Sequence, residues 1–561
     1  IATGEVNPEK ILGLTFTKKA ATELASRVRA MRKPAIEFRT GKVDDIELGE
    51  PAISTYNSFG ARLLKEHGLR IGIEPDARVV VDATRYQLAM RIVTQTKVPL
   101  AGLGFTNVVK VVKDLLELDS QCSDYLVDPS QVIQSDEELL QKLDVVPRPQ
   151  KLTDEMKQTA QQRIALAQLV MEFRESKKRE GMIDYSDQIR LAAQAALSSA
   201  EMRQMLKEQY EVVLLDEYQD TSVAQKKLLN ALFGDGHPVL AVGDPCQAIY
   251  GWRGAEVANI ENFHKDFKTS DGKEARKYEL KTNRRSGQLI LNTANKMSNA
   301  LRAIHKAIVE LTVGANDTNP GEVHTAVLNT FPEEVQWIAD QIQEQAKSTP
   351  LSDIAILLRQ KKHGALFVAA LEERGIPVQV ADAEVLIELP EVRDALCYLE
   401  LMVDPTANTA LVRLLAGPKW RIGARDLALL GRHAAKLAGY DYEQAKHLPV
   451  TEQLQQAVAG VDRADRVCLL DALELAAESN IDYSDEAKSR FTELSAQLRE
   501  LRKHAGDTAI DAIARIIRVS GLGIQALSRP MALGKAHDDR LGSLIDLAGA
   551  YRSLDGDSSV H

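Results

Sequence analysis

Cysteine is scarce in this chain of 561 residues, which contains only four. Cys122, Cys246, Cys397 and Cys468 lie far apart and form no C-x-x-C pair. This spacing speaks against a zinc site and against a disulfide framework, and it fits the reducing cytoplasm. Because no run of about 18 apolar residues occurs and no signal peptide opens the chain, we expect a cytoplasmic protein without membrane contact.

An excess of positive charge is also missing. The 70 Lys and Arg residues are outnumbered by 80 Asp and Glu residues, which gives a formal net charge of -10. This balance excludes a uniformly basic coat for nucleic acid, so any such contact depends on local basic patches. The length predicts about three or four domains.

Two apolar runs, Val212–Leu215 and Pro238–Val242, predict buried strands of a parallel sheet, whose functional residues gather where the strands end. Asp216 and Glu217 follow the first run, and Gln247 comes shortly after the second. Asp216 can hold Mg²⁺ through its water shell, and Glu217, also a metal-ligand candidate, can polarise the attacking water. Gln247 can sense a phosphate without repelling it. An acid pair alone could equally cap a strand, but this combination predicts a nucleotide-hydrolysing site.

Aromatic side chains follow the second run. Tyr250 and Trp252 flank Gly251, and Arg253 comes next, in a chain with only three Trp residues. Aromatic faces beside a guanidinium make a platform on which bases stack without sequence preference. The alternative is that Trp252 belongs to core packing, which is the commoner role of a loop Trp.

A locally basic helix start lies near the beginning of the chain. The stretch from Ile11 to Arg27 predicts a buried strand followed by an amphipathic helix, which Thr17 is placed to cap. Lys18 lies at the start of this helix, where backbone amides and a basic side chain can hold a phosphate; a solvated basic face on an ordinary helix is the alternative. Three more candidate phosphate contacts are Thr55, Asn57 and Ser58, with a plain polar turn as the alternative.

These residues lie in stretches that resemble the motifs of UvrD-like superfamily 1 DNA helicases, the group of UvrD, Rep, PcrA and RecB. Leu214–Thr221 and Val242–Ala255 resemble motifs II and III, and Thr15–Ala21 is similar to motif Ia. Thr55–Phe59 resembles the family's T-x-H-S-F element, with Asn57 in place of His. The resemblance implies contacts with single-stranded DNA for Thr15, Phe16, Thr17, Lys18, Thr55, Asn57, Ser58, Tyr250, Trp252 and Arg253.

Tyr278–Ser286 resembles motif IV, which opens the family's second motor domain. The resemblance implies that Arg285 is the arginine finger that stabilises charge on the transferring phosphoryl group. It also puts Arg284 where the family has an aromatic residue that stacks on adenine. A guanidinium plane can stack as well, so both arginines are candidate nucleotide contacts, together with Asp216, Glu217 and Gln247. A plain surface arginine is the alternative for Arg285.

The resemblance further implies an α/β fold with two RecA-like parallel-sheet motor domains, each with a mainly helical insertion. The expected segments are 1–68 and 183–278 for the first motor domain, 69–182 for its insertion, 279–388 for the second motor domain and 389–561 for its insertion. Apolar runs predict strands at Val323–Val327, Ile354–Leu358 and Val378–Val380. Helices are expected at 107–118, 156–178, 332–347, 364–374, 392–402, 409–415, 425–437, 464–478, 485–503 and 508–520. Gly423 belongs to a turn similar to the family's G-I-G element, which can seat duplex phosphates; a plain helix-turn-helix corner is the alternative.

For function, the resemblance implies an ATP-dependent 3′ to 5′ DNA helicase that uses ATP and Mg²⁺. It would act on single-stranded DNA and on junctions of single-stranded with duplex DNA, in repair or recombination. The alternative is a DNA-binding scaffold subunit of a helicase-nuclease complex whose motor is dead. The intact set of Asp216, Glu217, Gln247 and Arg285 favours the motor. An unrelated kinase with a phosphate loop is a more distant reading, since it would need no aromatic platform.

No G-x-x-x-x-G-K-[ST] phosphate loop occurs in the chain, and nothing matches the family's motifs V and VI. We therefore expect a fragment that runs from just after motif I to the end of the second insertion and does not hydrolyse ATP by itself. The sequences of three segments are similar to those of AdnB-like subunits of actinobacterial helicase-nucleases: Ser54–Tyr56, Lys65–Arg70 and Trp420–Leu427. This resemblance implies a partner helicase-nuclease subunit.

Overall fold

A computed structural model describes residues 6–40, 49–100, 104–105, 107–146, 151–305, 307–314, 319–381, 383–438 and 468–551. The chain divides into two compact units, Ile1–His324 and Thr325–His561. The first unit includes residues 279–324, so this division differs from the five segments expected from the sequence, whose boundaries stay a prediction.

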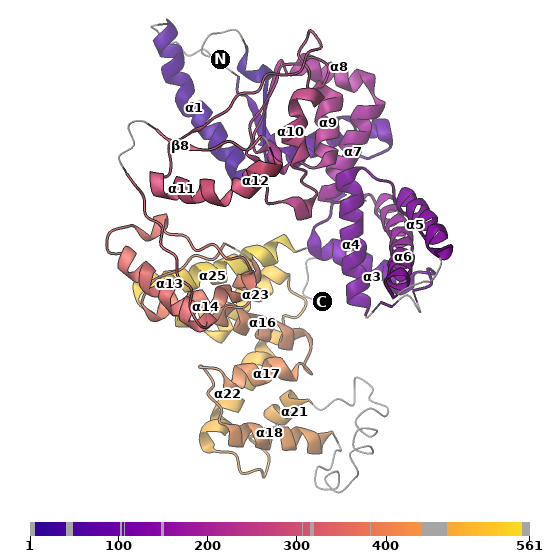
Figure 1. Ribbon diagram of the computed structural model, residues 1–561. Helices are drawn as coiled ribbons and strands as arrows, with labels where there is room; N and C mark the ends of the chain where they lie inside the picture. Colours follow the sequence, from indigo (N-terminus) through magenta and orange to yellow (C-terminus); the bar gives the residue numbers. More distant parts are fainter. Residues whose placement is uncertain are drawn as a thin grey trace. The chain divides into compact units, whose positions relative to one another are not determined.

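The first unit is built on a four-stranded parallel sheet with the strand order β2-β1-β5-β6 (Figure 1). The strands are β1 (Ile11–Thr15), β2 (Ala52–Thr55), β5 (Val212–Leu215) and β6 (Val239–Ala241). In the register, Leu14 lies beside Leu215, and Leu215 lies beside Ala241. The expected parallel sheet is thereby confirmed, and Asp216 and Gly243 come to the same edge.

One face of this sheet is covered by helices. Leu12, Leu14, Val213 and Leu215 are buried there against the helices α2 (Tyr56–His67), α7 (Tyr185–Ser198) and α9 (Val223–Phe233). Each fully buried side chain of this size stabilises the fold by about 1.5–3 kcal/mol. The helices α1 (Lys18–Thr40), α8 (Ala200–Gln209) and α10 (Ala258–Asp266) also belong to this unit.

The opposite face is open at β5 and β6. Leu214 is 40% exposed, Leu240 is 53% exposed and Val242 is 46% exposed. Leu214 and Leu240 are neighbours in the register, so these side chains form one apolar surface. Parallel sheets are normally covered on both faces, but none of the described helices buries these side chains. β6 is also an edge strand of the described sheet.

The helical insertion of the first unit contains α3 (Asp82–Gln95), α4 (Val108–Tyr125), α5 (Pro129–Asp144) and α6 (Lys151–Arg179). Both helices expected here are confirmed, although α4 and α6 are longer than the sequence indicates. A short parallel pair, β3 (Arg78–Val79) with β4 (Met182–Ile183), stands at its base.

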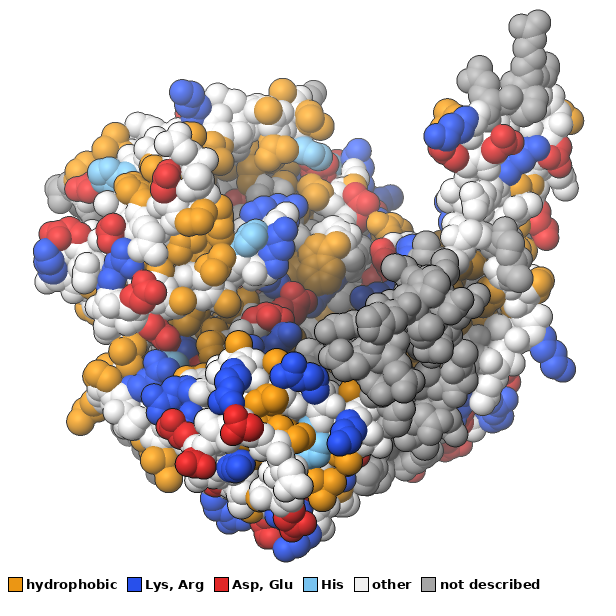
Figure 2. All heavy atoms as spheres, turned by 90° about the horizontal axis from the view of Figure 1, so that it is seen from below, with side chains coloured by type: hydrophobic (Ala, Val, Ile, Leu, Met, Phe, Trp, Pro, Cys, Tyr) orange, Lys and Arg blue, Asp and Glu red, His pale blue; other side chains and the backbone are white. Residues whose placement is uncertain are grey.

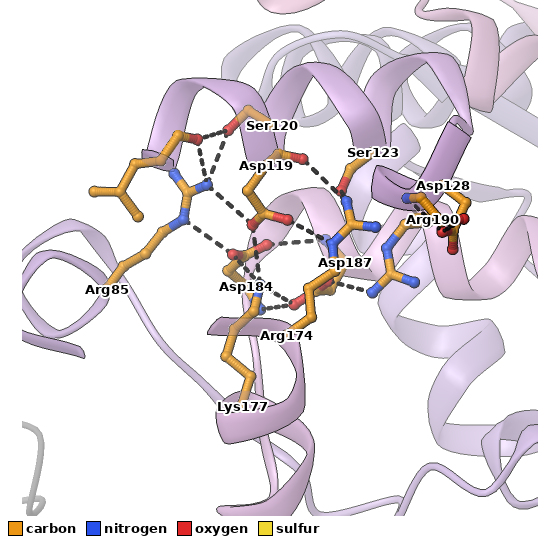
Figure 3. A network of polar contacts seen from close by, with 12 residues as sticks. Arg85, Asp119, Ser120, Ser123, Asp128, Arg174, Lys177, Asp184, Asp187 and Arg190 are labelled. Atoms are coloured by element: carbon orange, nitrogen blue, oxygen red, sulfur yellow. Dashed lines mark hydrogen bonds and ion pairs between the residues drawn. The ribbon is translucent and has the colours of Figure 1, made fainter. Parts of the chain in front are cut away.

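A buried charge cluster joins this insertion to α7. Asp119, Lys177, Asp184 and Asp187 are almost fully buried and point toward one another (Figure 3). The Lys177 ammonium lies 3.2 Å from Asp119 and 2.7 Å from both Asp184 and Asp187. Burial alone would raise the pKa of Asp119, but the positive charges of Lys177, Arg174 and Arg85 hold it well below its usual range. Asp184 and Asp187 also cap α7 reciprocally, which is a structural role.

Residues 278–314 contribute a second parallel pair, β7 (Thr282–Asn283) with β8 (Thr312–Val313), and the helices α11 (Gln288–Met297) and α12 (Asn299–Ile304). In the second unit, the helices expected at 332–347 and 364–374 are confirmed as α13 (Phe331–Gln345) and α14 (Gly364–Glu373), which pack together. The short helix α15 (Ala383–Leu386) follows.

The three strands expected between residues 323 and 380 are wrong. Val323–Val327, Ile354–Leu358 and Val378–Val380 are all described, and none forms a strand. Val327 is 100% exposed and Leu357 is 94% exposed. A preference for β structure depends on pairing with a neighbouring strand on a pleated surface, and none of the sheets in the described part of the chain includes these segments.

The remaining helices surround their own core. They are α16 (Pro390–Val403), α17 (Asn408–Ala416), α18 (Ala424–Leu437), α21 (Leu469–Glu474), α22 (Asp485–Arg502), α23 (Ala509–Ser520), α24 (Leu522–Leu527) and α25 (Met531–Ala550). Leu401, Leu411, Leu494 and Leu498 are fully buried among them. The expected helices are confirmed except over 464–478, where residues 464–467 lie outside the described part and the helix ends at Glu474.

The surface agrees with the acidic composition. On the face drawn in Figure 2, Lys and Arg side chains are interspersed with Asp and Glu, without a continuous basic coat. The four cysteines are free thiols. Within the described ranges, no helix has both the length and the apolar character needed to cross a membrane.

Replacing Lys177 by Met removes the cation at the centre of the charge cluster and leaves its carboxylates buried without that partner. Because breaking a buried pair costs about 3–5 kcal/mol, we expect Lys177→Met to lower the free energy of unfolding by that amount. Urea unfolding measures the change. Lys110→Met is the matched control, since the ion pair of Lys110 with Asp114 on the surface of α4 should contribute less than about 1 kcal/mol. Equal unfolding midpoints for the two variants would contradict the importance of the cluster.

Candidate functional site

A cavity of about 220 Å³ lies where β1 and β5 end. Its walls come from the start of α1, from the segment after β5 and from the segment after β6. They consist of Thr15, Phe16, Thr17, Ala20, Glu217, Gln219, Asp220, Gln247, Ile249 and Tyr250. Two catalytic candidates, Glu217 and Gln247, therefore share one cavity with Tyr250 of the aromatic stretch. The carboxylate of Asp216 does not line it, although Asp216 precedes Glu217 directly.

The acid pair is held in place through its backbone. The Asp216 amide donates to the Leu14 carbonyl at 2.8 Å, and the Tyr56 hydroxyl donates to the Asp216 carbonyl at 3.2 Å. Glu217 has a φ of +51°, in the left-handed region that non-glycine residues rarely adopt. Such a conformation costs about 1–3 kcal/mol and persists where surrounding contacts hold it, often at functional sites.

The electrostatics of the acid pair suit a cation. Burial raises the pKa of Asp216, and the neighbouring Glu217 carboxylate raises it further. Within the described residues, no three His, Cys, Asp or Glu side chains form a cage for a metal ion. Mg²⁺ is usually held by one or two carboxylates together with waters and substrate phosphates, so the two acids fit Mg²⁺ bound with a nucleotide.

Gln219 links the acid pair to the segment after β6. It is fully buried, and its side-chain NH₂ donates to Glu217 Oε2 at 2.7 Å and to Asp220 Oδ2 at 3.3 Å. Its side-chain oxygen accepts from the Asp244 amide at 3.1 Å. Asp244 in turn accepts from the side-chain NH₂ of Gln247 at 2.9 Å. A continuous chain of hydrogen bonds therefore runs from Glu217 to Gln247.

The aromatic side chains lie beside this chain of hydrogen bonds. The rings of Phe16 and Tyr250 stack with their centroids 4.6 Å apart, which joins the start of α1 to the segment after β6. Trp252 is 74% exposed, and the Arg253 guanidinium lies 4.6 Å from the centre of its ring. Trp252 is thus not a core residue, and its ring is accessible for stacking.

The Asp220 carboxyl faces the backbone of the segment after β6. Burial raises the pKa of this carboxyl, while the backbone amides of Ile249 and Tyr250, which face it, act in the opposite direction. Gln219 and Asp220 line the cavity but were not among the candidate residues predicted from the sequence. Their position directly behind the acid pair was the available signal. Tyr56 had no such signal, because its contact with Asp216 depends on a residue 160 positions away.

The other DNA-contact candidates differ in exposure. Thr15 is fully buried, and its hydroxyl has no hydrogen-bond partner among the described residues. The Thr17 hydroxyl caps α1 by accepting from the Ala20 amide at 3.1 Å, as expected, and Lys18 is exposed. Thr55 caps α2 by accepting from the Ser58 amide at 3.1 Å. Asn57 is half-buried and Ser58 is exposed.

The two arginines and Gly423 are not among the residues that line the cavity. Arg284 and Arg285 are exposed after β7, where Asn283 accepts from the Arg285 amide at 2.9 Å. Neither lines the cavity, so their roles at the nucleotide stay predictions. Gly423 is the exposed N-cap residue of α18 in the second unit. No described atom outside its own neighbours lies within 4 Å of the position that its Cβ would occupy.

Comparisons with known proteins agree with the motifs. Residues 1–268 match the UvrD/REP helicase N-terminal domain, and residues 278–557 match the UvrD-like helicase C-terminal domain. The chain is 26% identical over 434 residues to the ATP-dependent DNA helicase PcrA of Leuconostoc citreum, covering 77% of this chain and 51% of that protein. It is 27% identical over 437 residues to DNA helicase II of Haemophilus influenzae, covering 77% of this chain and 53% of that protein. It is 28% identical over 447 residues to a probable DNA helicase II homolog of Rickettsia conorii, covering 78% of this chain and 59% of that protein. The chain thus spans about half the length of these relatives.

Gln219→Leu tests the hydrogen-bonded link. The substitution leaves the half-buried Asp244 amide and the Glu217 carboxylate without this partner, so we expect the free energy of unfolding to fall by about 1–3 kcal/mol. Thermal unfolding measures the effect. Gln204→Leu on α8 is the control, because Gln204 is exposed and its replacement should change stability by less than about 0.5 kcal/mol. If the two variants unfold at the same temperature, the link through Gln219 carries no weight.

Proposed function

Because this chain belongs to the UvrD-like helicases, we propose that the whole protein is an ATP-dependent DNA helicase. It moves along single-stranded DNA from 3′ to 5′ and unwinds the duplex ahead of it, in repair or recombination. The direction rests on family resemblance. Since the chain spans about half of its relatives, this activity belongs to a longer form of the protein.

One observation carries the proposal: Glu217, Gln247 and the Phe16–Tyr250 stack line a single cavity. A site for nucleotide hydrolysis needs a carboxylate to polarise water, and Gln247 is positioned through Asp244 to respond to a phosphate. Tyr250 belongs to the same loop as the exposed Trp252. A change at the nucleotide therefore reaches the bases through only a few bonds.

ATP and Mg²⁺ fit the acid pair, of which Glu217 lines the cavity and Asp216 directly precedes it in the chain. Asp216 and Glu217 would hold the metal ion, which would neutralise charge on the phosphates when bound. Glu217 orients the attacking water and accepts its proton. The raised pKa of Asp216 reflects a carboxylate that is half-buried beside a second one, and a cation relieves that repulsion. Arg285, with Arg284, is proposed to contact the nucleotide.

Single-stranded DNA fits the aromatic side. Each base stacked on an aromatic ring contributes about 1–3 kcal/mol, and Trp252 with Arg253 offers an exposed ring and a guanidinium. Lys18 and the amides that open α1 add positive potential for phosphates. Thr15 and Thr55 are buried and Asn57 is half-buried, so these three residues would support the DNA path from within the fold. Ser58 is exposed and could contact the DNA directly.

The open face of the sheet has a proposed occupant. The chain contains no G-x-x-x-x-G-K-[ST] loop, and Leu214, Leu240 and Val242 form an uncovered apolar surface beside the edge of β6. We propose that a strand and a helix carrying such a loop cover this surface in the longer protein. The phosphates would then lie between that loop and the acid pair.

The motor-dead scaffold is not supported, because the three relatives are named as DNA helicases, the PcrA relative as an ATP-dependent one, and the acid pair is intact. No relative reported above is named as a helicase-nuclease subunit, so the expected partner subunit has no support from them. The four free thiols support a cytoplasmic location.

Glu217→Gln tests the motor in a form extended to include the phosphate loop. The change removes the carboxylate that accepts the proton of water, so DNA-stimulated ATP turnover should fall at least about 100-fold while ATP still binds. Glu211→Gln is the matched control, because Glu211 is an exposed residue just before the same strand. Undiminished turnover in Glu217→Gln, or no stimulation of the wild type by DNA, would count against the motor. Unwinding only of duplexes with a 3′ tail supports the proposed direction.

Gly423→Ala tests duplex binding by the second unit. The φ of Gly423 is -74° and its Cβ position is open, so alanine should leave the fold unchanged. A methyl group there keeps phosphates away from the helix N-terminus, and a contact of about 1 kcal/mol is lost, or about fivefold in duplex affinity. Fluorescence anisotropy with labelled duplex measures this. Gly431→Ala in the same helix also enters open space and serves as the control. Equal affinities of the two variants would leave the plain corner as the better reading.

A further inference from the structure

The last turn of α4 lies directly against the loop that carries the aromatic side chains. A Cβ added to Gly254 would lie 2.5 Å from the Cβ of Asp124 and 3.0 Å from its Oδ2. Gly254 has a φ of +73°, which favours glycine, and the close approach of Asp124 leaves no room for a larger residue. The helical insertion therefore contacts the backbone of this loop at one defined point.

Gly254 is the point where the loop closes on itself. Its amide donates to the Gly251 carbonyl at 3.1 Å, and the Ala255 amide donates to the Tyr250 carbonyl at 3.3 Å. Tyr250, Trp252 and Arg253 all belong to the turn that these two hydrogen bonds close. A shift of Gly254 would consequently carry the rings and the guanidinium with it.

The position of α4 is set by the buried charge cluster (Figure 3). Arg174 donates to Asp119 Oδ1 at 2.6 Å and to the Ser123 hydroxyl at 2.9 Å, one residue before Asp124. From the other side, Arg85 donates to the Leu116 carbonyl and to the Ser120 hydroxyl, both at 2.9 Å. Both arginines therefore hold the final turns of α4, the turns that carry Asp124.

Such a cluster is a poor way to gain stability, since desolvating its charges offsets most of their attraction. It is a good way to fix one helix in one position, because each guanidinium demands a particular set of acceptors. The cluster ties α4 to Asp184 and Asp187, which cap α7 of the sheet domain. The loop is thus held between two elements whose relative position the cluster determines.

We propose that Asp124 is a positioning residue for single-stranded DNA, which seats the Tyr250–Gly254 loop in the orientation that receives bases. The inference deepens the proposed function and rests on it. The helical insertion then influences base stacking without contacting the bases, because α4 packs against the backbone of the loop at Gly254. Neither the family match nor the motifs assign such a role to this helix.

The chemistry of Asp124 gives the contact a signature of its own. Burial raises the pKa of Asp124 to about 7; Arg85 of α3 opposes this, while Asp119 of α4 and Asp184 before α7 add to it. In the Tyr250–Gly254 loop, the charged residue next to Gly254 in the sequence is Arg253, whose guanidinium lies over the Trp252 ring. At a pH below its pKa this carboxyl is neutral. At a pH above its pKa it carries a negative charge in a site that is poorly solvated. The contact should therefore loosen as the pH rises through about 7.

The test measures the affinity of the longer, phosphate-loop-containing protein for a fluorescent single-stranded oligonucleotide by anisotropy, without nucleotide. Asp124→Ala should bind about tenfold more weakly, the size of losing one stacked base. Asp114→Ala on the same helix, which breaks only the ion pair with Lys110, should bind like the wild type. Equal binding by Asp124→Ala and Asp114→Ala would overturn the proposal.

Asp124→Asn supplies the second readout, because it keeps the shape of the neutral carboxyl and cannot ionise. From about pH 6 to about pH 8, the wild type should lose affinity severalfold relative to Asp124→Asn. Parallel pH profiles, or an asparagine variant as weak as alanine, would overturn the proposal. If the wild type binds DNA but does not hydrolyse ATP, the motor fails and the positioning role stands. If the wild type binds no single-stranded DNA, both fail.

Discussion

The hydrogen bond from the Asp216 amide to the Leu14 carbonyl is the constraint on which the site depends. It sets β1 and β5 in register, so that the start of α1 and the acid pair reach the same edge of the sheet. The next strand, β6, then delivers Gln247 and the aromatic loop beside them. Residues from three distant parts of the chain consequently line one small cavity, and a slip of one residue would turn the acids to the wrong face.

Within that frame, buried polar contacts hold groups that would otherwise move. Glu217 adopts a left-handed backbone, and the contact of its side chain with Gln219 is one of the interactions that offset this strain. Gln219 also fixes the Asp244 amide, so the acid and the segment after β6 cannot shift independently. This arrangement links Glu217, where the nucleotide is proposed to bind, with the aromatic loop, where bases are proposed to stack. The helix α4 packs against the same loop at Gly254.

The sequence predicted the features that depend on local pattern. The apolar runs before Asp216 and before Gly243, the cap at Thr17 and the helices expected by range, apart from 464–478, follow from periodicity and capping. It failed at Val323–Val327 and its two companions, because a strand needs a neighbour that the pattern cannot supply. It also missed Tyr56, Gln219 and Asp124, whose roles arise from contacts across the fold. Arg285 was named from its motif, but the described contacts do not bring it to the cavity.

The uncovered surface at Leu214 and Leu240 has a practical meaning for anyone who produces these 561 residues alone. An unpaired strand with apolar side chains beside it is a template on which a second molecule can add its own strand. Aggregation of such a preparation would thus begin at β6 and would not signify that the rest of the chain is misfolded. Charged residues introduced on that edge are the remedy that soluble sheet proteins themselves employ.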